Sequence, residues 1–483
     1  MSIDKAVLSE CFIETRSDEA YLKEILALDQ RLYHHFYDSI QVDKNLTRQW
    51  VSFQANKNES NYRWYKYKEA FSANLVEYLI LKYEIPLGRI LDPFAGAGTT
   101  LFLSAFLGYD SEGIELLPIG QEIIKSRITA QSDFSDESLA RLEFWKEHKP
   151  WKKSVNKKPI NTLRITAGAY SDETEKEMGK YLHKIREEND DVGGMLFFTL
   201  LCVLESISFT RKDGQYLRWD YRSGRRQGKN KFNKGEISSF EEAISNKLDE
   251  IVCDIKNNSS PQGDLFTNVD QSNHGKVNLY SGSTLEVMPQ LETLRYNAII
   301  TSPPYCNRYD YTRTYALEHA LLGISEVGLR ELRQQMVSCT VENRQKELMS
   351  YNQSWKKAIT ICDQNNLLQV TLNYLEFKKK KKELNNNGIA RMVRGYFYEM
   401  ACILQECYRV LRAGGIMFMV NDNVRYAGAS ISVDLILSSI AECLGFNIKN
   451  ILVLPQGKGN SSQQMGAHGR DELRKCIYVW EKK

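Results

Sequence analysis

Short apolar runs that stop at proline, glycine or small polar residues recur along the chain and predict the strands of a sheet. In the clearest case, Asn297–Thr301, aliphatic and β-branched residues form a run typical of a buried strand. Pro303 and Pro304 end this run, because neither can donate a backbone hydrogen bond to a sheet. Similar runs lie near residues 90, 112, 279, 417, 450 and 478. Their alternation with helical segments predicts an α/β fold.

Apolar residues at helical spacing predict the helices between these strands. They are Asp4–Ile13, Ala20–Tyr37, Ala73–Tyr83, Leu101–Leu107, Gly193–Ser208 and Tyr396–Leu411. The α/β pattern is lost twice, so the chain divides into an N-terminal helical segment (1–60), three core parts (61–120, 276–324 and 393–483) and two large inserted, mainly helical regions (121–275 and 325–392). Within the second inserted region, Lys378–Lys382 and Asn385–Gly388 predict a mobile basic loop.

A glycine-containing turn follows the strand near residue 90. Gly96 and Gly98 allow a tight turn and a close approach of the backbone to a ligand, and the helix after them offers free N–H groups. The next strand ends in Glu115, near the spacing of roughly 20 residues at which an acidic side chain binds ribose hydroxyls in nucleotide-binding proteins. Strand, glycine turn, helix, strand and acid together predict one half of a site for a nucleoside-containing cofactor.

The strand that ends at Thr301 presents a different chemistry. Ser302, Pro303, Pro304 and Tyr305 place a hydroxyl, backbone carbonyls and an aromatic ring at its carboxyl end. In open α/β sheets, ligands bind at the carboxyl ends of the strands. We therefore take these four residues as candidate catalytic residues.

Composition limits the functions that the chain can have. Its 483 residues are 42% hydrophobic and 26% charged, and the net charge is only +3, so any affinity for nucleic acid must come from local basic patches. No apolar run approaches the roughly 20 residues that span a membrane, and we expect a cytoplasmic protein. The ten cysteines show no metal-binding spacing, and we expect no metal.

One such basic patch lies in the first inserted region. Residues 209–226 contain many bases, few acids and interleaved aromatic residues. Arginine and lysine neutralise phosphates, and aromatic rings can stack on bases. The candidate DNA-binding residues are Arg211, Lys212, Arg218, Arg222, Arg225 and Arg226.

The motifs Asp92–Thr100 and Thr301–Tyr305 resemble those of the DNA amino-methyltransferases of restriction–modification systems, which methylate cytosine N4 or adenine N6. The resemblance implies a Rossmann-like, seven-stranded, mostly parallel sheet with helices on both faces and an antiparallel last strand. It also implies S-adenosylmethionine as the cofactor, double-stranded DNA as the substrate and a cognate restriction endonuclease as a partner.

The resemblance assigns a cofactor role to a set of residues around the glycine turn and the neighbouring strand ends. Glu115 would hold the ribose, Ser281 and Ser283 would lie near the adenine, and Phe71, with Tyr67, Lys68 and Ser72, would lie at the methionine end. The full cofactor-binding set is Phe71, Asp92, Phe94, Ala95, Gly96, Gly98, Thr99, Glu115, Ser281 and Ser283.

The residues of the catalytic motif suit methylation of an amine. The lone pair of an exocyclic amine is delocalised into the base, and acceptors on its N–H groups favour a nitrogen that can attack a methyl group. The hydroxyl of Ser302 and the carbonyl of Pro303 are such acceptors, fixed by the two prolines. Tyr305 would stack on a base flipped out of the duplex. This chemistry needs neither a covalent enzyme intermediate nor a metal.

The sequence excludes one other methylation reaction and leaves three alternative functions open. Methylation at cytosine C5 needs a thiolate after a proline, whereas Cys306 follows Tyr305. In the family that the chain resembles, Ser at the position of Ser302 favours cytosine N4, and Asp or Asn favours adenine N6. An adenine N6 enzyme, an RNA-amine methyltransferase and a non-catalytic DNA-binding subunit of a defence complex remain as alternatives.

Overall fold

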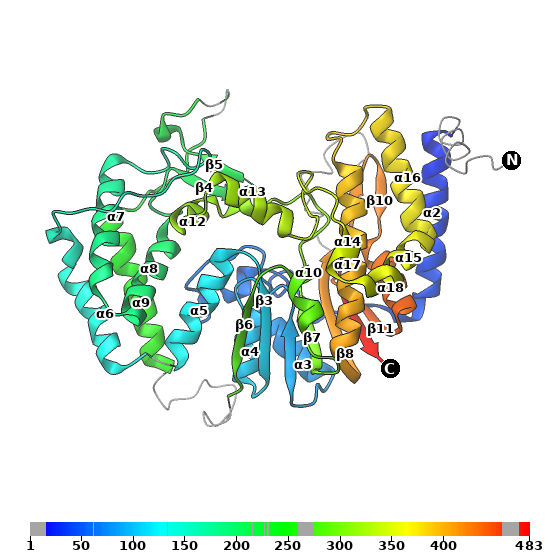
Figure 1. Cartoon of the computed structure of the whole chain (residues 1–483), viewed down its shortest axis with the longest axis horizontal. Helices are drawn as coiled ribbons and strands as arrows, with labels where there is room; N and C mark the ends of the chain where they lie inside the picture. The colour runs from blue at the N-terminus through cyan, green and yellow to red at the C-terminus, as the bar shows by residue number, and fades with distance from the viewer. Residues whose placement is uncertain are drawn as a thin grey trace.

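Eight strands form one central sheet in this computed structural model, in the order β1-β11-β12-β8-β7-β2-β3-β6 (Figure 1). The structure describes residues 16–60, 62–132, 134–214, 216–226, 228, 231–258, 274–455 and 473–483. The strands of the sheet are β1 (Ile40–Val42), β2 (Arg89–Asp92), β3 (Asp110–Glu115), β6 (Val277–Ser281), β7 (Tyr296–Thr301), β8 (Leu411–Asp422), β11 (Phe446–Val453) and β12 (Lys475–Lys482).

The pairing of the strands is mostly parallel. β12 runs antiparallel to both of its neighbours, β8 and β11, and each of the other pairs is parallel. This confirms the predicted α/β class with a mostly parallel sheet. Among the described residues, the sheet has eight strands rather than seven, because Ile40–Val42 adds an edge strand to β11 from a segment predicted to be helical. Three residues at an edge are too few to show an alternating pattern in the sequence.

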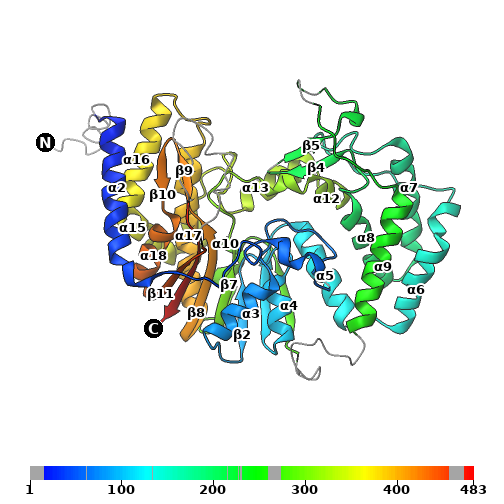
Figure 2. The same ribbon diagram turned by 180° about the vertical axis from the view of Figure 1, so that it is seen from behind.

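Helices cover both faces of the sheet (Figures 1 and 2). Side chains at alternate positions of the strands pack on one side with α3 (Ala73–Lys82) and on the other with α17 (Ile389–Val410) and α18 (Val433–Leu444). In β7, for example, Ile299 packs on the α17 side and Ile300 on the α3 side. Both faces of the central strands are therefore buried, as expected of a parallel sheet.

The remaining helices and hairpins extend this core on both sides. They are α2 (Asp18–His35), α4 (Thr99–Phe106), α5 (Pro118–Ser132), α6 (Asp136–His148), α7 (Asp172–Lys184), α8 (Asp190–Val203), α9 (Phe240–Asn258), α10 (Thr284–Val287), α11 (Tyr311–Thr314), α12 (Ala316–Leu321), α13 (Glu326–Gln335), α14 (Leu348–Tyr351), α15 (Lys356–Gln364), α16 (Asn366–Lys380), and the hairpins β4 (Thr210–Asp213) with β5 (Tyr216–Trp219) and β9 (Val424–Tyr426) with β10 (Ala429–Ile431). Short 3₁₀ turns occupy Tyr37–Ser39, Phe53–Asn58, Pro150–Lys153, Ile185–Glu187, Tyr221–Ser223, Met288–Gln290 and Gln353–Trp355.

The first inserted region forms a separate helical lobe with its own core (Figure 1). Helices α6 to α9 pack around buried aromatic side chains, among which the rings of Trp145 and Trp151 stack with centroids 5.8 Å apart. Helix α5 packs against the sheet strands β3 and β6, so the predicted boundary at residues 120–121 falls inside a helix. Helix α17 likewise begins at Ile389 rather than Tyr396, and the boundary at 392–393 falls within it.

The predicted mobile basic loop of the second inserted region is wrong for its lysines. Lys378 lies in the last turn of α16, is buried, and pairs with Asp18 of α2 at 2.6 Å and with Glu383. Lys381 also pairs with Asp18, at 3.1 Å. Periodicity alone could not show that these ammonium groups have acidic partners in a distant helix. The predicted helix Asp4–Ile13 lies outside the described residues.

No helix among the described residues is long and apolar enough to cross a membrane. Within the same residues, no three His, Cys, Asp or Glu side chains are grouped so that they could hold a metal ion.

Candidate active site

A cavity of about 560 Å³ lies where the carboxyl ends of β2, β3, β7 and β8 meet. It is lined by residues from the glycine turn after β2, the end of β3, the turn after β7 and the facing ends of β8 and β12. The lining includes these predicted site residues: Phe71, Asp92, Phe94, Ala95, Gly96, Thr99, Glu115, Ser283, Ser302, Pro303, Pro304 and Tyr305. The structure thus brings the candidate cofactor and catalytic residues to one cavity.

The glycine turn is built as its sequence predicts. Gly96 and Gly98 have φ angles of 55° and 76°, and Gly98 caps the N-terminus of α4. A Cβ atom on Gly98 would lie 2.9 Å from side-chain atoms of Ile124 and Phe102. Gly98 therefore shapes the turn and the packing of α4, although it does not line the cavity.

Glu115 is held at the end of β3 by backbone N–H groups. Its Oε2 accepts the N–H of Gly96 and its Oε1 accepts the N–H of Leu117, both at 2.6 Å. Burial raises the pKa of its carboxyl to about 8, against the lowering effect of these hydrogen bonds. Each oxygen of this carboxyl group can still take part in a further hydrogen bond on the cavity side.

Asp92 connects the two halves of the site. Its Oδ1 accepts hydrogen bonds from the hydroxyl of Thr301 at 2.6 Å and from the N–H of Phe94 at 3.0 Å. The carboxyl is buried, which raises its pKa to about 6. Asp92 thereby ties the glycine turn after β2 to the end of β7, just before the catalytic motif.

Ser302 and Tyr305 face each other in the turn after β7. The hydroxyl of Ser302 lies 3.1 Å from the hydroxyl of Tyr305 and 3.3 Å from the carbonyl of Val420 on β8, to which it can donate. Donation to that carbonyl leaves the oxygen of Ser302 as an acceptor. Burial raises the pKa of Tyr305, so its hydroxyl stays neutral near pH 7.

Sequence reasoning missed Asp422 and Lys475, which also line the cavity. They are paired residues of β8 and β12, with the Lys475 Nζ 3.4 Å from the Asp422 Oδ1 and 5.6 Å from the Tyr305 ring centroid. Asp422 follows the predicted strand Ile416–Val420 by two residues, and an acidic residue just after a strand was an available signal. Lys475 begins an antiparallel strand, so nothing in the local sequence places it beside β8.

The segment before α3 contributes differently from what the resemblance implied. Tyr67 lines the cavity and stacks on Tyr315 with ring centroids 5.0 Å apart. Lys68 lines it too, with its ammonium bound to the carbonyl of Lys212. Ser72 is buried and caps α3 through the N–H of Leu75 at 3.3 Å, so its hydroxyl has a structural role.

The two serines near the end of β6 lie in different surroundings. Ser281 is exposed and does not line the cavity. Ser283 is buried, and its hydroxyl donates to the carbonyl of Gln335 at 2.8 Å. Ser283 thus fastens the end of α13 beside the cavity.

The basic run forms the β4–β5 hairpin, and its cations differ in exposure. Lys212 is buried, and its Nζ lies 2.6 Å from the Glu318 carboxylate and 2.9 Å from the Tyr65 hydroxyl. A buried ammonium with these partners is not placed to contact a phosphate, and we remove Lys212 from the candidate DNA-binding set. The other candidates keep exposed or half-buried side chains: Arg211, Arg218, Arg222, Arg225 and Arg226.

Three of these arginines have structural partners. Arg218 pairs with the half-exposed Asp213 at 3.2 Å. Arg222 forms a bidentate ion pair with the buried Asp220. Its Nε lies 2.7 Å from Oδ1 and its Nη2 lies 3.0 Å from Oδ2. Arg225 donates to the carbonyl of Ala167 at 2.6 Å, and its guanidinium carbon lies 3.4 Å from the centroid of the Trp219 rings. Arg211 and Arg218 stand opposite each other on the exposed face of the hairpin.

Comparison with known proteins shows that the chain belongs to the type II DNA methyltransferases of the N4/N6 family, whose substrate is DNA. The DNA methylase family model for N6 and N4 enzymes matches residues 9–126. The chain is 53% identical to Type II methyltransferase M.AvaI of a Nostoc species and of Anabaena variabilis, over 97% of this chain and 96% of each relative. It is 39% identical to Type II methyltransferase M.BsoBI of Geobacillus stearothermophilus, over 95% of this chain and 92% of that relative. Enzymes of this family take the methyl group from S-adenosylmethionine.

Proposed function

We propose that this chain transfers a methyl group from S-adenosylmethionine to the N4 amine of a cytosine flipped out of duplex DNA. The observation that carries the proposal is that a single cavity is lined both by the glycine turn with Glu115 and by Ser302 and Tyr305. Its volume of about 560 Å³ lies within the range of about 300–1,000 Å³ that small-molecule sites occupy. A methyl donor and an acceptor base can therefore meet in this cavity.

The residues present fit S-adenosylmethionine. A Cβ atom on Gly96 would lie only 3.3 Å from the ring of Tyr67, so glycine keeps this wall of the cavity open. Glu115 binds the ribose hydroxyls with the acceptor capacity left on its two oxygens, and Phe71 and Phe94 supply apolar surface. When bound, the cofactor supplies an electrophilic methyl group on a sulfonium centre.

The turn after β7 orients the target amine. Ser302 Oγ and the carbonyl of Pro303 accept the two N–H groups of the amine, which turns the nitrogen lone pair toward the methyl group. The ring of Tyr305 stacks on the flipped base. The two prolines and the contact between Ser302 and Val420 hold these groups before the substrate arrives, so little reorganisation is needed.

Asp422 is placed to accept the proton that the amine loses. The neutral hydroxyl of Ser302 is too weak a base, and the carboxyl groups of Asp92 and Glu115 are already engaged by N–H or hydroxyl donors. The Oδ1 of Asp422 is buried, makes no hydrogen bond in the described part of the chain and has only the ionic contact with Lys475. The side chain is 36% exposed, so the proton can pass on to solvent.

The identity of Ser302 supports cytosine over adenine as the target. In the family, Ser at this position favours cytosine N4, whereas Asp or Asn favours adenine N6. A serine hydroxyl accepts hydrogen bonds less strongly than a carboxylate. The nearby carboxylate of Asp422 supplies the stronger acceptor that Ser302 lacks.

Analysis of the methylated nucleoside tests this proposal. The chain is incubated with S-adenosylmethionine labelled in the methyl group and either duplex DNA or RNA, and the nucleic acid is digested to nucleosides. We expect the label in N4-methyldeoxycytidine. Label in N6-methyldeoxyadenosine would overturn the choice of base, and label in RNA alone would overturn the substrate class.

We also propose a cognate restriction endonuclease as a partner in the cell, cutting the sequence that this chain methylates. DNA methylated by the chain should resist that enzyme, and unmethylated DNA should be cut. Cleavage of both DNAs at equal rates would reject the pairing.

A further inference from the structure

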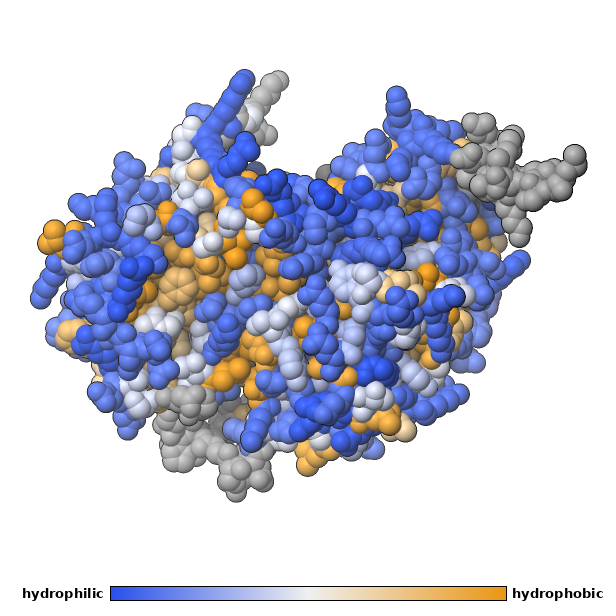
Figure 3. All heavy atoms as spheres, in the orientation of Figure 1, coloured by the Kyte–Doolittle hydropathy of each residue, from blue (hydrophilic) through white to orange (hydrophobic). Residues whose placement is uncertain are grey.

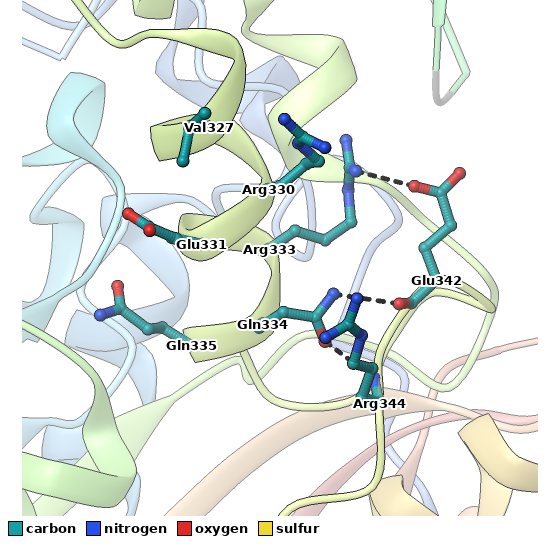
Figure 4. Close-up of a pocket in the computed structure, with 8 residues that line it drawn as sticks. All are labelled: Val327, Arg330, Glu331, Arg333, Gln334, Gln335, Glu342 and Arg344. Atoms are coloured by element: carbon teal, nitrogen blue, oxygen red, sulfur yellow. Dashed lines mark hydrogen bonds and ion pairs between the residues drawn. The ribbon is translucent and has the colours of Figure 1, made fainter.

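A second hollow lies next to the candidate active site, on the outer side of α13 (Figure 4). This groove, with a volume of about 580 Å³, runs between α13 and the loop that contains Glu342 and Arg344. Gln335 lines both the groove and the active-site cavity, so the two adjoin at this residue. Helix α13 lies between the helical lobe and the lobe that contains α14 to α18 (Figures 1 and 2).

The groove has a rigid floor made of paired charges. The buried Arg333 bonds Glu342 at 2.8 Å and Asp310 at 3.0 Å, and Arg313 pairs with both acids from the other side. The side chain of Gln334 joins the helix to the loop: its amide donates to the carbonyl of Glu342 at 3.1 Å and its oxygen accepts the N–H of Arg344 at 2.8 Å. Helix and loop are therefore locked together before any ligand binds.

Two arginines of the groove remain outside this network. Arg330 and Arg344 are exposed, and in the described part of the chain neither guanidinium pairs with an acidic side chain. Arg330 makes one local bond, from its Nε to the carbonyl of Glu326 at 3.2 Å. Of the two acids that line the groove, Glu342 is occupied by Arg313 and Arg333, and Glu331 points away to the opposite side of α13 (Figure 4). The groove thus presents the positive charges of Arg330 and Arg344 on a helix and a loop that are held together by hydrogen bonds and ion pairs.

We propose that this groove binds the sugar–phosphate backbone of the DNA beside the flipped base, with Arg330 and Arg344 as phosphate ligands. The inference rests on the proposed function, because it places the duplex over the cavity in which the base reacts. An open hollow with two exposed guanidinium groups, neither paired with an acidic side chain of the described residues, suits the phosphates of a DNA strand. The surface over α13 between the two lobes is hydrophilic, as such a contact requires (Figure 3).

The salt dependence of DNA binding tests the proposal. Affinity for a labelled DNA duplex is measured by fluorescence anisotropy at several salt concentrations. The unaltered chain is compared with the double variant R330A/R344A. Each phosphate contact adds about 0.9 to the slope of log K against log salt, so we expect the slope to fall by about 1.8 in magnitude. At about 50–200 mM salt, the affinity of the double variant for duplex DNA should be clearly lower than that of the unaltered chain.

A matched control and a folding check complete the experiment. Arg412 is exposed near the start of β8, at the opposite end of this strand from Asp422 and the cavity, and R412A should keep the original slope. The affinity of R330A/R344A for S-adenosylmethionine and its melting temperature should match those of the unaltered chain. An unchanged slope in the double variant would overturn the inference while duplex binding and methylation by the unaltered chain still stood. A chain that neither bound nor methylated duplex DNA would overturn the proposed function, and this inference with it.

Discussion

At the scale of single residues, Ser302 is the residue on which the proposed chemistry depends. Its Oγ lies 3.3 Å from the carbonyl of Val420 and 3.1 Å from the hydroxyl of Tyr305, so an alanine would remove an amine acceptor without removing a packing element. We expect S302A to lower the rate of methyl transfer at least about 100-fold, the loss typical of a deleted transition-state hydrogen bond. Its affinity for S-adenosylmethionine should change little. Single-turnover kinetics and equilibrium dialysis measure the two quantities.

The matching control for S302A is S439A. Ser439 lies on α18, where it contacts Asn365 at 3.3 Å, away from the cavity. S439A should methylate DNA at the original rate. Full activity in S302A would show that the amine is bound elsewhere.

A second prediction at this scale concerns pH and the carboxyl of Glu115. Burial raises its pKa from 4.5 to about 8, so between these values the folded chain holds a proton that the unfolded chain has lost. The stability provided by the neutral carboxyl is therefore complete below about pH 4.5 and is lost as pH rises to about 8, by at most roughly 1.4 kcal/mol per pH unit. E115Q cannot titrate, and it should lose less stability over this range.

Urea unfolding of the chain without cofactor, at several pH values, measures this difference. E147Q is the control, since Glu147 is exposed on α6 and its replacement should leave the pH profile unchanged. Parallel profiles for E115Q and the unaltered chain would mean that Glu115 titrates normally.

The sequence predicted the position of those site residues that belong to a local motif. It did not predict the surroundings of residues that reach the site or the core through distant contacts. The glycine turn and Ser302–Tyr305 lie where their motifs predict, because the backbone near a strand end fixes where these residues point. The prediction that Lys212 binds DNA was based on its place in a run of basic residues. The sequence does not show which residues of such a run face solvent and which face a buried acid, as Lys212 does. Lys475 was missed because only the antiparallel pairing of β12 with β8 brings it to the cavity.

At the scale of elements, the β4–β5 hairpin separates cations that can meet DNA from cations that hold the fold. Arg211 and Arg218 stand opposite each other on its exposed face. Arg218 pairs with Asp213 at 3.2 Å, but both side chains of this pair are about half exposed, so a phosphate can compete for the guanidinium. We expect R211A/R218A to weaken binding of duplex DNA and to reduce the salt slope, as measured by anisotropy. R222A should instead lower the melting temperature, because it leaves the buried Asp220 without its main partner. A salt slope that stays the same in R211A/R218A would assign the hairpin a purely structural role.

Elements were predictable where a long periodic pattern existed. Helices α2 and α3 begin and end within two residues of the predicted limits, and the strands of the core lie where short apolar runs precede turns. The edge strand β1 could not be predicted, because its three residues gain their hydrogen bonds from β11, which is about 410 residues away in the sequence. The early start of α17 at Ile389 was hidden by the polar residues around it.

At the scale of the whole molecule, one buried charge cluster joins the helical lobe to the core. Lys212 comes from β4, Glu318 from α12 after the catalytic turn, and Tyr65 from the segment before the glycine turn. The side chains of Lys212 and Glu318 are 4% and 1% exposed. Removing one charge of such a pair leaves the other buried and unpaired, which costs about 3–5 kcal/mol. We expect K212M to destabilise the chain by that amount, measured by urea unfolding.

The double variant K212M/E318Q distinguishes a structural role of Lys212 from a DNA-binding one. Glutamine at 318 is neutral and still accepts the hydrogen bond that Tyr65 donates at 2.8 Å, so most of the lost stability should return. If the ammonium of Lys212 served DNA, the folded double variant would lose about 0.9 from the salt slope of DNA binding. We expect no such loss, since the ammonium faces Glu318 and Tyr65 rather than solvent. A restored fold with an unchanged slope would show that this lysine holds the lobe beside the active site, where the exposed arginines of the hairpin can reach the same duplex.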